Sequence, residues 1–222
     1  MRSIASGLVL FSLAAPAAAQ QDHAQHAPPA ADDAAQQSVL PEGWRMRLDR
    51  ANANPAEVRF TTMDPGWHVT TGPAAIFYRA ESTASGAFRA QAAIHLMKPS
   101  EHAEAYGFFI GGRNLDQDDQ DYLYFLVRQD GKYLIKHRAG SETHTIVDWT
   151  DHPAVVKGST EGSVKNVLAI DAGPSELAFY VNGQEVERLE RPAYANTDGV
   201  VGLRVNHRLD VHIESLTVEP QG

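Results

Sequence analysis

The chain has 222 residues, 43% of them hydrophobic, with a formal net charge of −9 and no cysteine. The acidic balance argues against a polyanionic partner such as nucleic acid and leaves neutral glycans, cations and proteins open. Without cysteine the chain cannot form a disulfide, and its length is sufficient for a hydrophobic core to stabilise a domain alone.

The first residues have the features of a secretory signal peptide. Arg2 precedes an apolar run over residues 4–14, and an Ala-rich stretch ends at Ala19. The run is too short to span a bilayer, so we expect no membrane-embedded segment. Cleavage after Ala19 would give a signal peptide over 1–19 and a periplasmic or secreted protein. Residues 20–40 are rich in Ala, Gln, His and Pro without aromatics, which predicts a disordered linker.

The remaining residues, 41–222, alternate apolar and polar side chains in short segments separated by turn residues. A period of two is typical of half-buried β-strands. Asp130-Gly131 and Asn182-Gly183 predict tight hairpins, and only 99–105 suggests a short helical turn. We expect one all-β domain, a two-sheet antiparallel jelly-roll sandwich. Its predicted strands cover 44–48, 58–63, 67–71, 75–78, 87–97, 106–112, 122–128, 132–138, 143–149, 164–171, 177–181, 185–189, 199–205 and 209–218.

Five segments resemble the concanavalin A-like lectin/glucanase superfamily, and more narrowly its exported bacterial domains near the 3-keto-disaccharide hydrolase and laminin-G-like branches. The resemblance implies a two-sheet jelly roll of a kind that hosts lectins, glycosidases, lyases and passive modules. The segments are Y-G-F-F-I-G-G (106–112), Y-L-Y-F-L-V-R (122–128), G-K-Y-L-I-K (131–136), F-Y-V-N-G-Q-E-V (179–186) and G-V-V-G-L-R-V-N-H (199–207).

The sequence departs from this superfamily in two places. Its glucanases use an E-x-D-x-x-E strand, whose carboxylates act as acid and nucleophile, and no such triplet occurs here. The keto-disaccharide hydrolase branch opens with Leu-Phe-Asn-Gly before a Trp, whereas residues 40–44 keep only the Gly-Trp end. These departures favour a binding module over an enzyme.

A cluster of carboxylates marks the loop between the strands at 106–112 and 122–128. Four carboxylates within six residues repel one another, and Ca²⁺ would relieve that repulsion by accepting oxygen ligands. The spacing is not that of an EF-hand, and an acidic, solvated loop is the alternative interpretation. The predicted calcium ligands are Asp116, Asp118, Asp119 and Asp121.

Histidines are the candidates for chemistry. Asn206-His207-Arg208 predicts a tight turn, and the strand after it places Asp210, His212 and Glu214 on one face. A histidine beside carboxylates can act as a general base or a metal ligand, although a surface histidine with charged neighbours is the alternative. The catalytic candidates are His68, His137, His207 and Asp210.

Aromatic side chains on a sheet face predict a ligand surface, because sugars stack on Trp and Tyr rings while polar side chains bind their hydroxyls. Packing under loops is the alternative role for the same rings. The candidate ligand residues, with Lys136 and Arg138 as neighbours, are Trp67, His68, Tyr122, Tyr124, Arg128, His137, Trp149, Asn206 and His207.

Three functions therefore remain open. The first is an exported jelly-roll module that binds a carbohydrate or similar small ligand without chemistry. The second is a glycoside hydrolase or lyase of the 3-keto-disaccharide hydrolase type, using a histidine or Asp210 and a metal where one binds. The third is a structural or adhesion-like module.

Overall fold

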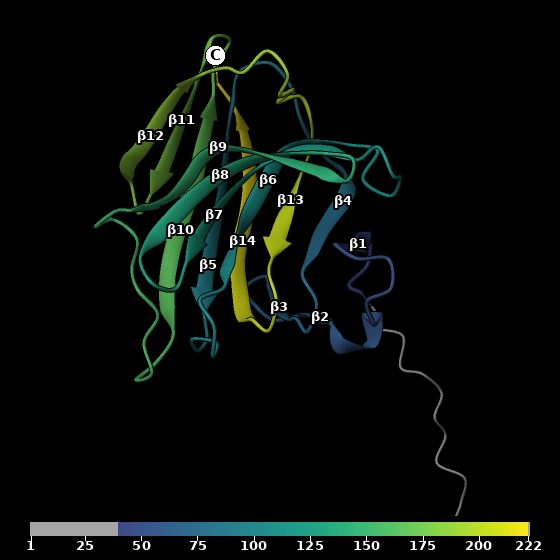
Figure 1. Cartoon of the computed structure of the whole chain (residues 1–222), viewed down its shortest axis with the longest axis vertical. Helices are drawn as coiled ribbons and strands as arrows, with labels where there is room; N and C mark the ends of the chain where they lie inside the picture. Colours follow the sequence, from purple (N-terminus) through teal and green to yellow (C-terminus); the bar gives the residue numbers. More distant parts are fainter. Residues whose placement is uncertain (1–39, 222) are drawn as a thin grey trace, which may run out of the picture. The chain divides into compact units, whose positions relative to one another are not determined.

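The computed structural model describes residues 40–221, which form two antiparallel β-sheets of seven strands each (Figure 1). The predicted all-β, two-sheet jelly roll is thereby confirmed. The signal peptide predicted over 1–19 and nearly all of the linker predicted over 20–40 lie outside the described residues. In the part of the chain that is described, no helix has the length and apolar character needed to cross a membrane.

The first sheet, sheet A, has the strand order β1-β4-β13-β6-β7-β8-β9. Its strands, in that order, are Trp44–Leu48, Ala75–Ala84, Gly199–Val205, Ala105–Arg113, Asp121–Arg128, Lys132–Ala139 and Glu142–Asp151. The second sheet, sheet B, has the order β12-β11-β10-β5-β14-β3-β2. Its strands are Gln184–Glu190, Glu176–Val181, Val164–Ala172, Phe88–Leu96, Asp210–Pro220, Trp67–Thr70 and Arg59–Thr62.

The main hydrophobic core lies between the two sheets. Along each strand, every second side chain faces this core, because successive side chains point to opposite faces of a sheet. Aromatic rings from opposite sheets meet there: Phe125 of β7 lies 5.3 Å from Phe179 of β11. At the other side of the core, Phe60 of β2 lies 4.9 Å from Phe77 of β4. Because these contacts join strands far apart in sequence, the two sheets form one core.

The turns follow the predicted residue chemistry. Gly131 joins β7 to β8 with φ of 95°, and Asn182 and Gly183 join β11 to β12 with φ of 51° and 80°. These left-handed conformations are the ones that Asn and Gly adopt at low cost.

Two local expectations were wrong, and one short helix was not predicted. Residues 99–105 contain bends and no helix, whereas a 3₁₀ helix, Pro55–Glu57, follows an Asn54 cap that accepts from the Ala56 amide. Strand β4 extends to Ala84 rather than ending at Tyr78, because Thr83 and Ala84 pair with the start of β13. Pairing partners distant in sequence lengthen a strand beyond its own local signal.

Candidate functional site

The outer face of sheet A, which points away from sheet B, carries a second cluster of buried apolar side chains. The alternation that sends Phe125 inward sends Tyr122 and Tyr124 to this face. Their rings lie 5.7 Å apart, and Tyr122 lies 5.0 Å from Phe109 of β6. The cluster consists of Ile76, Tyr78, Ala105, Phe109, Leu115, Tyr122, Tyr124, Leu126 and Leu134, with Trp149 and Val200 beside it.

A buried charge pair sits on this aromatic layer. Arg204 of β13 is 7% exposed, and its two terminal nitrogens donate to Asp49 at 2.9 and 2.6 Å. It also donates to the Tyr122 hydroxyl at 3.1 Å, and its guanidinium lies 4.8 Å from the Tyr124 ring centre. Bidentate geometry of this kind is the strongest form of an arginine–carboxylate pair.

Burial and the contacts of this pair shift the pKa values of Asp49 and the two tyrosines. Burial alone raises the pKa of Asp49, but the hydrogen bonds and the charge of Arg204 outweigh burial and hold that pKa below its ordinary value. Burial raises the pKa of Tyr124 to about 12 and raises that of Tyr122 as well. At neutral pH the layer therefore presents neutral hydroxyls around one compensated ion pair.

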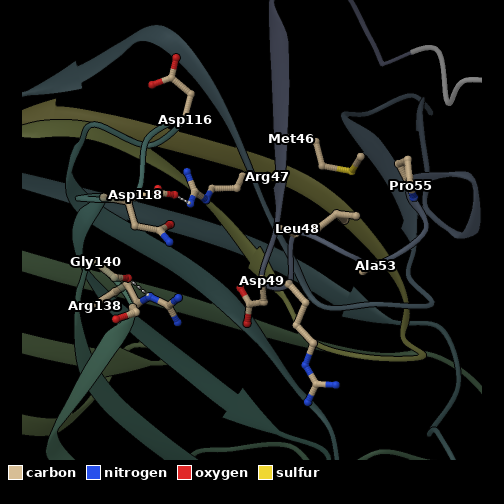
Figure 2. A pocket seen from close by; sticks show the side chains of 14 residues that line it. Met46, Arg47, Leu48, Asp49, Ala53, Pro55, Asp116, Asp118, Arg138 and Gly140 are labelled. Carbon is tan, nitrogen blue, oxygen red and sulfur yellow. Dashed lines mark hydrogen bonds and ion pairs between the residues drawn. The ribbon is translucent and has the colours of Figure 1, made fainter.

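A polar groove of about 780 Å³ opens beside this layer (Figure 2). Three segments line it: the chain after β1, the acidic loop before β7 and the turn between β8 and β9. Figure 2 shows Asp49 and Arg138 on facing sides of the groove. Its polar side chains include Arg47, Asp49, Arg50, Asp116, Asp118, Gln120, Arg138 and Ser141.

Hydrogen bonds to the backbone hold the walls of the groove. Arg47 of β1 donates to the Leu115 and Gln117 carbonyls at 3.3 and 2.7 Å, which ties the acidic loop to the first strand. Arg138 donates to the Gly140 carbonyl at 2.6 Å. These contacts use only part of each guanidinium, so donors remain for a ligand.

The predicted ligand residues divide between the two sheets. Tyr122, Tyr124, Arg128 and Trp149 share the outer face of sheet A, where Arg128 lies 4.4 Å from the Trp149 ring centre. Tyr122 is only 1% exposed, so its ring supports the surface from below. Trp67 does not join them: it lies on β3 of sheet B, 4.9 Å from Trp44. The alternation of residues predicts which side chains of a strand share a face. It does not predict to which of the two sheets the strand belongs.

The three histidines proposed for catalysis lie in three different surroundings. His68 pairs with Asp210 at 3.0 Å on sheet B. His137 pairs with Asp121 at 3.0 Å beside a cavity of about 500 Å³. His207 lies in the predicted turn after β13, with Asn206 just before it, 3.9 Å from Glu104. The structure brings none of these pairs to the groove of Figure 2.

The carboxylates of the acidic loop bind separate partners. Asp118 lies 3.8 Å from Arg47, Asp119 accepts from Asn114 at 2.8 Å, and Asp121 faces His137. Asp116 lines the groove. Among residues 40–221, no group of three or more His, Cys, Asp or Glu side chains is gathered for a metal ion. Calcium binding by this loop stays a prediction.

Sequence reasoning missed Asp49 and Arg204, whose contact spans 155 positions. A signal was present, because Arg204 interrupts the otherwise apolar run of β13. A charge within a fully buried strand requires a partner, but the sequence does not identify which carboxylate supplies it.

Comparison with known proteins supports the fold. No family model matches the chain, and a sequence search of curated proteins also found no match. Among solved structures, the carbohydrate-binding module CBM66 from Bacillus subtilis aligns with a TM-score of 0.59 and 13% identity, covering 80% of this chain and 95% of that one. A Bacillus licheniformis β-glucanase aligns at 0.57 and 12%, covering 84% and 96%.

A third neighbour, a Bacillus subtilis protein of unknown function with a galectin-like fold, aligns at a TM-score of 0.57 and 9% identity, covering 82% of this chain and 93% of that one. The three neighbours include a binding module, an enzyme and a protein without an assigned role. At such identities the likeness concerns the backbone arrangement alone. The chain has a concanavalin A-like jelly-roll fold.

Proposed function

We propose that the protein is a carbohydrate-binding module whose ligand occupies the groove on the outer face of sheet A. The observation that carries this proposal is a row of fixed hydrogen-bonding side chains, including Arg47, Asp49 and Arg138, beside a rigid aromatic layer. Adjacent sugar hydroxyls are matched by groups that donate or accept in pairs, such as guanidinium and carboxylate.

The structural neighbours give this proposal a second support. Their printed descriptions include a carbohydrate-binding module and a β-glucanase, so the same backbone arrangement carries sugar sites elsewhere. Fold likeness alone does not transfer an activity, and the argument for this chain therefore depends on the groove. Mixed charge, polar walls and partial exposure suit a ligand rich in hydroxyl groups.

The test is a glycan array run together with product detection on the same sugars. We expect retention of at least one oligosaccharide without turnover. A Ser141→Trp variant, which places a bulky ring at the exposed turn lining the groove, should remove retention. Thr160→Trp, on an exposed loop outside the groove, is the matched control and should retain it. Absence of any retained oligosaccharide would contradict the proposal, as would equal retention by both tryptophan variants.

A second candidate function, acid–base chemistry on a glycoside, is favoured by the cavity at the start of β7. His137 is 3% exposed, its Nε2 faces Asp121 at 3.0 Å, and its Nδ1 is buried without a partner among residues 40–221. Tyr194 and His144 complete the lining. Product formation that is lost in His137→Gln but kept in Ser141→Trp would favour this function over simple binding.

A further inference from the structure

The outer face of sheet A is rich in basic side chains, although the chain as a whole is acidic. The chain carries a net charge of −9, which at first favours a neutral or cationic partner. Yet the alternation that points Tyr122 and Tyr124 outward also places basic side chains on this face. They are Arg45 and Arg47 on β1, Arg128 on β7, Lys132, Lys136 and Arg138 on β8, and Arg204 on β13.

Most of these cations have a carboxylate partner. Arg204 binds Asp49, Arg128 binds Asp130 at 2.7 Å, and Lys132 binds Asp151 at 2.8 Å. Arg47 lies 3.8 Å from the exposed Asp118. These pairs compensate the charges of four of the seven basic side chains, including the buried Arg204.

Arg45, Lys136 and Arg138 are the exceptions, since within residues 40–221 none of them has a carboxylate within the ion-pair distance of 4.0 Å. Arg45 is exposed on the edge strand β1, whereas Lys136 and Arg138 are partly buried and lie two positions apart on β8. Lys136 is flanked across the sheet by Tyr124 and Thr145, and Arg138 by Tyr122 and Thr143. All four neighbours are neutral, and burial raises the pKa of both tyrosines, so these hydroxyls supply no negative charge. Asp49 acts on Arg138 only at longer range and is already compensated by Arg204.

The distance between Lys136 and Arg138 limits the size of an anion that can contact both side chains. Residues two apart on a strand face lie about 6.5–7 Å from each other. Two like charges at this separation, each partly buried, repel one another and lose solvation. One anionic group placed between them would relieve both effects, and a guanidinium beside an ammonium is a strong donor set for a carboxylate or sulfate.

We propose that the saccharide bound on this face is acidic, with a carboxylate or sulfate group held between Lys136 and Arg138. This inference rests on the proposed carbohydrate binding and names its ligand class. Arg138 lines the groove, and Lys136 lies two positions before it on β8. The other groove side chains would bind the neutral hydroxyls of the same sugar or of its neighbours along the polysaccharide. Asp116 and Asp118 also line the groove and would repel a second acidic group there.

The experiment compares matched polysaccharides by affinity electrophoresis and titration calorimetry. Each pair has the same backbone with and without an acidic group: galacturonan against its methyl ester, glucuronan against glucan, mannuronan against mannan, and a sulfated against an unsulfated galactan. We expect an acidic member to bind at least about ten-fold more tightly than its neutral partner, the size of one charge-assisted contact. Raising NaCl from 0.05 to 1 M should weaken that binding, because the screening length falls to about 3 Å.

Substitutions assign the effect to the two residues. Lys136→Gln should reduce binding of the acidic polysaccharide about ten-fold and leave the weak neutral binding unchanged, because Lys136 does not line the groove. Arg138→Gln should reduce binding of the acidic polysaccharide at least as much and should also weaken neutral binding, because Arg138 lines the groove. Lys132→Gln is the matched control, because it removes a lysine of the same strand face that Asp151 already neutralises. It should change the affinity less than two-fold. Melting temperatures confirm that all three variants are folded. Binding of carboxylated members alone or sulfated members alone identifies which anionic group is used.

Two results would overturn the inference, and they differ in what they imply. Equal, salt-independent binding of neutral and acidic members would remove the acidic preference while leaving carbohydrate binding in place. Absence of binding to every member would remove the proposed function and the inference together. Loss of acidic binding in Lys132→Gln equal to that in Lys136→Gln would also contradict the assigned position.

Discussion

At the scale of single residues, the Arg204–Asp49 pair is the contact on which the outer face of sheet A depends. The Arg204 side chain is 8% exposed and that of Asp49 24% exposed, and the pair joins the residue after β1 to the middle of sheet A. Burial costs the Arg204 guanidinium its solvation, and the contact with Asp49 offsets much of that cost. The same guanidinium holds the Tyr122 hydroxyl and faces the Tyr124 ring. Removal of either partner should therefore lower the stability of the fold and also disturb the groove beside the pair.

We expect Asp49→Ala to lower the free energy of unfolding by about 3–5 kcal/mol, because Arg204 would stay buried without a counter-charge. The double variant Asp49→Leu with Arg204→Met should recover most of this loss, since no charge is then left buried. Urea unfolding followed by circular dichroism measures both effects. A single variant that unfolds at the wild-type urea midpoint would show that the pair contributes little.

A row of three histidines crosses the outer face of sheet B. His212 of β14 pairs directly with His68 of β3 and with His95 of β5. His68 contacts Asp210, and His95 contacts Glu214 at 2.8 Å. Burial, followed by the charges of His95 and His68, lowers the pKa of His212 below its ordinary value. Hydrogen bonds from His95 and Lys165 lower the pKa of Glu214 to about 2.

The pH dependence of stability follows from these two shifts. Both pKa values are lower in the folded than in the unfolded chain, so the unfolded chain binds protons first as pH falls. We expect stability to decrease below pH 6.5 as His212 resists protonation, and again from pH 4.5 towards 2 as Glu214 is protonated. Urea midpoints from pH 8 to 3 measure this profile.

His212→Asn should flatten the first part of the profile. His102→Asn, in an exposed loop, is the control and should leave the profile unchanged. A wild-type midpoint that is constant between pH 7.5 and 5 would contradict the effect assigned to His212.

At the scale of elements, the strands could be predicted because their signal is local. The period-two alternation and the turns at Gly131 and Gly183 require no partner from elsewhere in the chain. The order of strands in each sheet depends on pairs distant in sequence, such as β13 with β4, and no local pattern encodes it. For the same reason Tyr122 was placed on the correct face, while Trp67 was grouped with the wrong sheet.

The outer face of sheet A and its groove could be predicted only in part. Tyr122, Tyr124, Arg128, Lys136 and Arg138 were expected to share a surface, since they lie on two adjacent strands joined by a hairpin. The walls of the groove come from loops after β1 and before β7, which meet through Arg47 and backbone carbonyls. Loop contacts of this type leave no periodic signal in the sequence.

Close packing across sheet A gives an element-scale prediction at Gly202 of β13. A Cβ there would lie 2.5 Å from the Phe109 ring and 2.6 Å from the Phe77 carbonyl. We expect Gly202→Ala to destabilise the fold by about 1–3 kcal/mol, because the ring and strand must move to make room. Gly162→Ala is the matched control, since nothing lies within 4 Å of its Cβ position. Equal urea midpoints for the two variants would contradict this packing account.

At the scale of the whole molecule, the last two strands complete both sheets. Strand β13 lies between β4 and β6 in sheet A, and β14 lies between β5 and β3 in sheet B; both are yellow in Figure 1. Neither sheet has its full set of hydrogen-bonded neighbours until the end of the chain is in place. Since their inner faces also share one core, neither sheet should be stable without the other.

We therefore expect both sheets to unfold in a single transition. The tryptophans allow this to be measured, because Trp149 lies on sheet A and Trp67 on sheet B. One variant keeps only Trp149 and another keeps only Trp67, with phenylalanine at the other tryptophan positions. In each variant, tryptophan fluorescence and far-ultraviolet circular dichroism should give the same urea midpoint. A Trp149 signal that changes at lower urea than the circular dichroism of the same variant would show that sheet A opens first. The shared core would then not couple the two sheets.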